Sequence, residues 1–253
     1  MSTQLASPVR TTMQAMTDGL RKILGARLLA VYLGGSAAMG DFCDASSDLD
    51  FLVVTDGRLS LEDALAVQLL HKDLLRRHAY AAKLEGDYAP RETLVPEGTS
   101  EPVPGCERGR FLPKVGEIML SSDNIANMRD YGIAFYGPDP AQLLPPVSPD
   151  EVRAAVRMML AQGLAPTESA AEAASGLLNL LRSASSLEQG RPTTKSEGAA
   201  WGLAHLDGTW HEAIETALAV RSGRERPGDA DALRGVLAHL EQWVRSRYLP
   251  CSC

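Results

Sequence analysis

The sequence predicts an α+β fold, with an N-terminal domain of mixed helices and strands followed by a C-terminal bundle of helices. Up to about residue 137, apolar patterns typical of helices alternate with patterns typical of strands. Five prolines then crowd residues 138–150, a density that stops regular structure. Nearly every later segment has helical spacing. We therefore expect a domain over residues 1–137, a proline-rich linker over 138–150 and a helical domain over 151–253.

The N-terminal elements follow from local patterns. Residues 8–25 have apolar side chains at helical spacing, and residues 60–77 indicate a second helix that begins at Ser60. The stretches RLLAVYL (27–33) and DLDFLVVT (48–55) favour buried strands. Further along we expect a strand over 80–84 ending at Glu85, a long polar loop over 95–109, short strands near Phe111 and Val115, and a helix from Ser122.

The C-terminal half reads as five helices. Ser148 followed by Pro149 is typical of a helix start, because serine caps the first turn and proline suits the first helical position. The predicted helices span residues 149–163, 167–189, 194–204, 208–222 and 228–247.

Composition and charge narrow the function classes. The formal net charge is −7, and residues 1–150 carry 14 Lys/Arg against 20 Asp/Glu, which argues against a nucleic-acid partner. No run of about 18 apolar residues predicts a membrane span. The four cysteines, including the Cys251/Cys253 tail, and the five histidines lack metal-site spacing, so we expect surface or interface positions for the histidines. These features favour a cytoplasmic monomer with a small cationic or hydroxylated partner.

The candidate metal- and phosphate-binding residues lie close together in residues 34–54, GGSAAMGDFCDASSDLDFLVV. Asp48 and Asp50 lie two apart on a predicted strand, so their side chains project to the same side. Two adjacent carboxylates repel unless a cation neutralises them, and Mg²⁺ is the natural ion because it prefers oxygen ligands. Gly35 and Ser36 open a turn further upstream, with eleven residues between Ser36 and Asp48, and there backbone N–H groups and a hydroxyl can hold phosphate oxygens.

This order of motifs resembles the nucleotidyltransferase superfamily with the DNA polymerase β-like fold, which implies a mixed sheet. The resemblance lies in an apolar strand, Gly34-Gly35-Ser36, a spacer, and Asp48-Leu49-Asp50 on the next strand. It also implies ATP as co-substrate, two Mg²⁺ ions, and a third carboxylate that completes the metal site or acts as general base. Glu85 is the better candidate and Asp87 the alternate.

Past the linker the chain is similar to the aminoglycoside (3'')(9) adenylyltransferases, the streptomycin and spectinomycin resistance enzymes. The similarity lies in LNLLR (178–182) and in GRPTTKSEGAAW (190–201). It implies that Arg182 and Lys195 reach the ATP phosphates, and that an acid such as Glu172 contacts the cationic drug, with Asp87 as a further acidic contact. Two family positions differ: Arg221 stands where the family has a tyrosine, and the first-domain tryptophan of the drug pocket has no counterpart.

The sequence thus predicts Mg²⁺-dependent transfer of AMP from ATP to a hydroxyl of a streptomycin- or spectinomycin-like acceptor. Asp48 and Asp50 are the predicted metal ligands, Glu85 the predicted base, and Gly35 and Ser36 the predicted phosphate-binding turn. Three alternatives stay open. They are a nucleotidyltransferase with another acceptor, such as a protein side chain, a catalytically silent nucleotide-binding relative, and an RNA-modifying transferase, which the acidic first domain disfavours.

Overall fold

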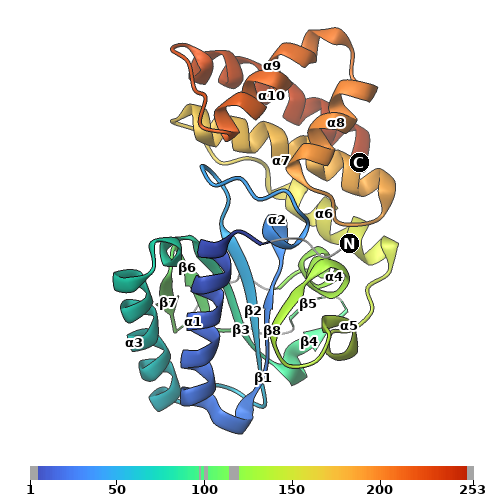
Figure 1. The fold of residues 1–253 in the computed structure, drawn as a ribbon. Helices are drawn as coiled ribbons and strands as arrows, with labels where there is room; N and C mark the ends of the chain where they lie inside the picture. Colours follow the sequence, from blue (N-terminus) through green and yellow to red (C-terminus); the bar gives the residue numbers. More distant parts are fainter. Residues whose placement is uncertain (1–4, 97, 100–101, 114–119, 250–253) are drawn as a thin grey trace. The chain divides into compact units, whose positions relative to one another are not determined.

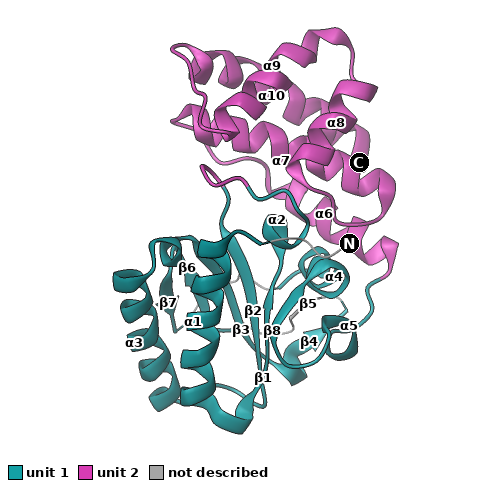
Figure 2. Cartoon of the chain, in the orientation of Figure 1, with its two compact units in different colours: residues 1–42, 47–147 teal, residues 43–46, 148–253 magenta. Residues whose placement is uncertain are grey.

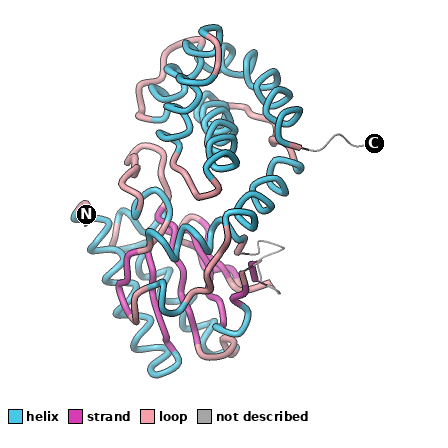
Figure 3. The backbone as a smooth tube through the Cα atoms, turned by 90° about the vertical axis from the view of Figure 1, so that its right-hand side faces the viewer, coloured by secondary structure: helices cyan, strands magenta, loops and turns pink. Residues whose placement is uncertain are grey.

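A computed structural model describes residues 5–96, 98–99, 102–113 and 120–249. The chain divides into two compact units, the first comprising residues 1–42 and 47–147 and the second residues 43–46 and 148–253 (Figure 2). Strands occur in the first unit, and the described part of the second consists of helices and loops (Figure 3). No helix in the described part of the chain is both long and apolar enough to cross a bilayer.

The first unit is built on a six-stranded mixed sheet with the order β7-β6-β3-β2-β1-β8 (Figure 1). The pair β2–β3 is parallel and the other pairs in this sheet are antiparallel, while β4 and β5 form a separate two-stranded sheet. The strands are β1 (Leu28–Leu33), β2 (Leu49–Thr55), β3 (Leu84–Pro90), β4 (Leu94–Val95), β5 (Gly98–Thr99), β6 (Gly105–Glu107), β7 (Arg110–Leu112) and β8 (Ile133–Tyr136).

Helices cover both faces of this sheet (Figure 1). The helices are α1 (Ser7–Leu24), α2 (Gly35–Ala38), α3 (Leu61–Arg77), α4 (Ser122–Tyr131) and α5 (Pro140–Leu143). One face packs on α1 and α3 through a core that includes Phe51 and Tyr88. The other packs on α4 and α5 through a smaller core that includes Leu52 and Ile125. Alternate residues of β2 thus serve the two cores, as a strand's two-residue period requires.

The second unit is a bundle around one buried helix. Its helices are α6 (Pro149–Gln162), α7 (Ala170–Gln189), α8 (Lys195–His205), α9 (His211–Arg221) and α10 (Asp229–Tyr248). Thirteen residues of α7 are buried, and α6, α8, α9 and α10 all pack against it. Helix α6 begins as predicted, with Ser148 as the cap and Pro149 at the first position. The predicted α+β fold class is confirmed.

Several local predictions were wrong. The expected strand over 80–84 is mostly a 3₁₀ segment, Ala79–Lys83. Strand β3 begins only at Leu84, so Glu85 is its second residue and does not end a strand. The expected loop over 95–109 contains β5 and β6, and the proline-rich 138–150 contains α5, because prolines at a first helical position are tolerated. The strand expected near Val115 and the Cys251/Cys253 tail lie outside the described residues.

His71 corrects the expectation that the histidines lie at the surface. It is 1% exposed, on the face of α3 that packs on the sheet. Its Nδ1 lies 3.0 Å from the Gly109 carbonyl oxygen, so Nδ1–H donates there, and Nε2 accepts from the Tyr88 hydroxyl at 2.6 Å. Burial lowers the pKa of His71 to about 4, because desolvation disfavours the imidazolium. The neutral ring thereby connects α3 to β3 and to the β6–β7 turn.

The buried His71 predicts an acid-sensitive fold. Its pKa lies near 4 in the folded chain and near 6.5 when unfolded, so between these values the unfolded state binds the extra proton. The free energy of unfolding should therefore fall as pH falls through this window, by at most about 1.4 kcal/mol per pH unit from this residue. We expect the double variant His71→Leu/Tyr88→Phe to lose less stability between pH ~7 and pH ~5, measured by urea unfolding. Equal losses in the two proteins would contradict this account.

Candidate active site

The glycine turn contacts Asp50 directly. After β1 the chain enters α2, the single helical turn Gly35–Ala38, and the Gly34 N–H donates to the Asp50 carbonyl oxygen at 2.8 Å. Gly35 has φ +57°, and a Cβ at this position would lie 1.8 Å from Oδ2 of Asp50. A side chain there is therefore excluded both by backbone conformation and by the carboxylate. The turn and Asp50 lie side by side because Gly35 has no side chain.

Asn127 holds the same turn from the other side. This residue of α4 accepts a hydrogen bond from the Gly35 N–H at 2.7 Å, and its amide nitrogen lies 2.9 Å from the sulfur of Met39. The Gly35 N–H is thus already engaged within the first unit. A phosphate group at this turn would use other donors, such as those around Ser36. The sequence interpretation missed Asn127, and its helix pattern carries no signal that distinguishes it.

The sheet register brings Glu85 to Asp50. Asp50 and Glu85 are partners across the parallel β2–β3 pair, so both project to the same face. The pKa of Glu85 is raised, first by partial desolvation and then by the charges of Asp48 and Asp50. The structure therefore brings three predicted site residues, Asp48, Asp50 and Glu85, to one end of neighbouring strands. The correction to β3 leaves this grouping intact.

Asp87 lies further into the same face. It is in register with Leu52 and is 9% exposed. Burial, with the nearby charge of Glu85, raises the pKa of Asp87 to about 7. A carboxyl group that is half protonated at neutral pH is a weaker partner for an ammonium group than a fully ionised one. Asp87 suits a supporting position beneath Glu85 better than direct contact with a cation.

The loop before β2 is held by Lys83. Its ammonium donates to the Ser47 carbonyl oxygen at 3.1 Å and lies 5.8 Å from the ring centroids of both Phe42 and Tyr80. These contacts position the backbone immediately before Asp48, whose side chain is exposed. Cation–π and hydrogen-bond contacts of this kind immobilise a loop without burying its acid.

The chemistry of these carboxylates fits a divalent cation completed by a ligand. In the described part of the chain, no three Asp, Glu, His or Cys side chains form a ready metal site. However, Mg²⁺ is commonly held by one or two carboxylates plus substrate phosphates. Asp48 and Asp50 raise the pKa of Glu85 by repulsion, which is the interaction a cation would relieve.

In the second unit, Arg182 and Lys195 are organised by the α7–α8 crossing. The Thr193 hydroxyl donates to the Arg182 carbonyl oxygen at 3.1 Å. A Cβ at Gly198 would lie 2.5 Å from the backbone nitrogen of Arg182, so α8 approaches the backbone of α7 closely. Lys195 occupies the first turn of α8, and its ammonium donates to Ser175 of α7 at 2.9 Å. A cation in a first turn opposes the helix dipole, which favours anions there.

Glu172 has a local structural role. It is the third residue of α7 and forms a capping box with Ser169. Its carboxylate accepts from the backbone N–H groups of Glu168 and Ser169 at 2.7 and 3.0 Å, and these bonds lower the pKa of Glu172. The side chain is also exposed, so it is accessible to a cationic group. Its contact with a cationic substrate stays a prediction.

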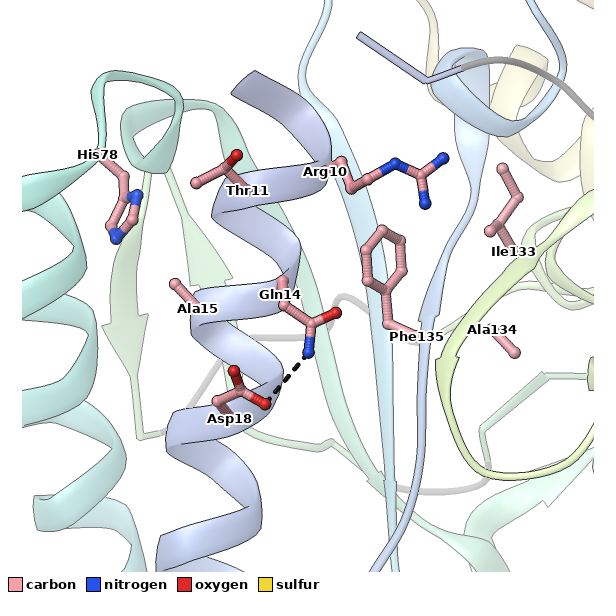
Figure 4. A pocket seen from close by; sticks show the side chains of 9 residues that line it. All are labelled: Arg10, Thr11, Gln14, Ala15, Asp18, His78, Ile133, Ala134 and Phe135. Carbon is pink, nitrogen blue, oxygen red and sulfur yellow. Dashed lines mark hydrogen bonds between the residues drawn. The ribbon is translucent and has the colours of Figure 1, made fainter. Parts of the chain in front are cut away.

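An open pocket of about 530 Å³ lies elsewhere, along α1 and the edge strand β8 (Figure 4). Gln14 donates to Asp18 on its wall at 3.1 Å, and Phe135 and Ile133 form the opposite side. None of its nine lining residues is a predicted site residue. The pocket therefore contributes nothing to the chemistry described above.

Two comparisons with known proteins found similarities, one to a protein family and one to a solved structure. Residues 142–245 match the family model described as "Aminoglycoside adenylyltransferase, C-terminal domain". The chain also resembles a crystal structure of spectinomycin adenyltransferase AAD(9) from Enterococcus faecialis with ATP and spectinomycin, with a TM-score of 0.73 and 18% identity. The match covers 93% of this chain and 99% of that one. No curated protein matches the sequence.

The structural match shows that the chain shares the fold of that adenyltransferase over nearly its whole length. The family model covers residues 142–245, less than half of the chain, so the similarity to the aminoglycoside adenylyltransferases is shown for that segment.

The Gly35 contact predicts a sharp difference between two glycine substitutions. Gly35→Ala should displace the Asp50 carboxylate and lower the rate of any reaction that uses this carboxylate by about 100-fold, since a misplacement near 1 Å can cost that much. Gly40→Ala is the matched control, because Gly40 also has positive φ but a Cβ added there would meet nothing within 4 Å. It should lose about 1–2 kcal/mol of stability and keep its kcat. Similar activity losses in both variants would contradict the role of the Asp50 contact.

Proposed function

We propose that the protein transfers AMP from ATP to a hydroxyl group of a streptomycin- or spectinomycin-like acceptor and releases pyrophosphate. One observation carries the proposal: the Asp50–Glu85 strand partners lie beside a glycine turn in a chain with the adenylyltransferase C-terminal domain. The solved neighbour that carries ATP and spectinomycin supports this choice of nucleotide and acceptor class.

Glu85 is the proposed general base. Its raised pKa makes the carboxylate a stronger base, and its exposure lets an acceptor hydroxyl reach it. The hydroxyl oxygen then attacks the α-phosphorus, the bond to the bridging oxygen breaks, and pyrophosphate leaves. Asp87 lies buried beneath Glu85, and the charge of Glu85 helps to raise the pKa of Asp87, so the two carboxyl groups compete for protons.

Asp48 and Asp50 are the proposed Mg²⁺ ligands, and two ions are the number that the superfamily resemblance implies. Bound Mg²⁺ would neutralise phosphate charge that the carboxylates would otherwise repel. Ser36 and the Gly35 turn would bind triphosphate oxygens, and Arg182 and Lys195 would add positive charge. Lys195 suits this role because an anion would relieve its unfavourable position in the first turn of α8.

The proposal predicts a product. Incubation with ATP, Mg²⁺ and a panel of aminoglycosides plus spectinomycin should give at least one acceptor whose mass rises by one adenylyl group, detected by mass spectrometry. A Mg²⁺-free reaction is the control and should give no adduct. If no member of the panel is modified, the acceptor assignment is wrong, and a protein or another small molecule becomes the better candidate.

The base assignment predicts a selective loss. Glu85→Gln should lower kcat by about 10²- to 10⁴-fold with little change in folding, because an amide cannot accept the proton. Glu107→Gln provides the control: this exposed acid also raises the pKa of Glu85, but it has no assigned role in the reaction. It should keep most of its activity. A Glu85→Gln variant with wild-type kcat would remove Glu85 from the mechanism.

A further inference from the structure

A buried acceptor on α7 has no partner. Oδ1 of Asn179 is inaccessible to solvent and makes no hydrogen bond, and it is the one such side-chain atom found among the described residues. Leu178 and Leu180 on either side are buried in the bundle core. An unpaired buried acceptor destabilises a fold, and asparagine is a weak helix former. Packing alone therefore gives no reason for asparagine at this position.

The place of Asn179 on the helix indicates a use. Ser175, Asn179 and Arg182 are spaced i, i+4 and i+7, so they lie on one face of α7. Ser175 accepts the hydrogen bond from Lys195, and Arg182 lies where Gly198 lets α8 approach. Asn179 thus lies between Ser175, which binds the Lys195 ammonium, and Arg182, whose backbone α8 approaches. All three α7 residues are partly exposed, on a helix whose buried residues are apolar or small.

The chemistry of the unpaired atom restricts its partner. A carbonyl oxygen accepts and cannot donate, so it requires a group that carries a hydrogen. The ionised triphosphate of ATP has acceptors only and cannot satisfy it. Hydroxyl and ammonium groups can, and both substrates of the proposed reaction carry them: the nucleotide on its ribose, the acceptor on its rings.

We propose that Asn179 is a substrate-contacting residue: when substrate binds, the side chain reorients, and its oxygen, inaccessible in the free protein, accepts a hydrogen bond from a hydroxyl or ammonium group of that substrate. This inference rests on the proposed function and adds a third polar contact to Arg182 and Lys195. The cost of the unpaired oxygen in the free protein is then offset when substrate binds. Functional sites commonly show such a trade-off between stability and activity.

The test uses the full-length chain with three substitutions. Asn179→Leu removes the acceptor and should raise the Tm, since an unpaired polar group is replaced by an apolar one among leucines. The same change should raise the KM for one substrate by about 10-fold, the loss expected for one hydrogen bond. Asn179→Asp keeps an acceptor and should bind that substrate better than the leucine variant. Ser185→Ala, on the buried side of α7, is the control and should leave both KM values unchanged.

The measurements also identify the donor. If the ribose donates, the KM for ATP rises, and 2′-deoxy-ATP or 3′-deoxy-ATP loses affinity for the wild type but not for Asn179→Leu. If the acceptor donates, only its own KM rises. A leucine variant with both KM values unchanged would overturn the inference. Calorimetric binding of ATP and of spectinomycin to wild type and variant measures the same contact without turnover. Absence of AMP transfer by the wild type would instead count against the proposed function.

Discussion

The first unit depends on one close contact, the approach of the Gly35 backbone to the Asp50 carboxylate. It requires a residue without a side chain at positive φ, and it is supported by the Gly34 hydrogen bond to the Asp50 carbonyl and by Asn127. Once Asp50 is fixed, the parallel register fixes Glu85, and the two-residue period places Asp87 one step deeper. A glycine turn after one strand therefore organises carboxylates on two others.

The two faces of the sheet differ in charge: one carries acidic side chains, and the other buries a neutral polar pair. On the face of α4, the charge of Asp50 helps to raise the pKa of Glu85, and the charge of Glu85 helps to raise that of Asp87, so the site accumulates negative charge that a cation or a proton relieves. On the face of α3, His71 and Tyr88 are buried as a neutral hydrogen-bonded pair. The neutral pair connects α3 to β3, the strand that carries Glu85 and Asp87 on its other face.

Local sequence patterns predicted those elements whose own residues determine their structure. The alternation in residues 48–55 and the glycine turn identified the Asp50 side of the site, and Ser148-Pro149 identified the start of α6. Sequence reasoning failed where long-range pairing decides: β3 begins at Leu84 because that residue pairs with Leu49, and nothing in residues 80–84 indicates this. Asn127 was missed for the same reason, since its contact with Gly35 spans 92 positions.

In the second unit, helix packing relates two residues, Arg182 and Lys195, that form only a weak sequence motif. From the sequence pattern alone, Arg182 could be a solvated residue at a helix end and Lys195 a solvated residue at the end of a loop. Gly198 lets α8 cross the α7 backbone at Arg182, and the Thr194 cap starts α8 so that Lys195 reaches Ser175. Lys195 is thereby bound to the face of α7 that carries Arg182 and the unpaired oxygen of Asn179. A cation opposed to its helix dipole and an acceptor without a donor are both unfavourable in the free protein, and an anionic ligand that also carries hydroxyl groups relieves both.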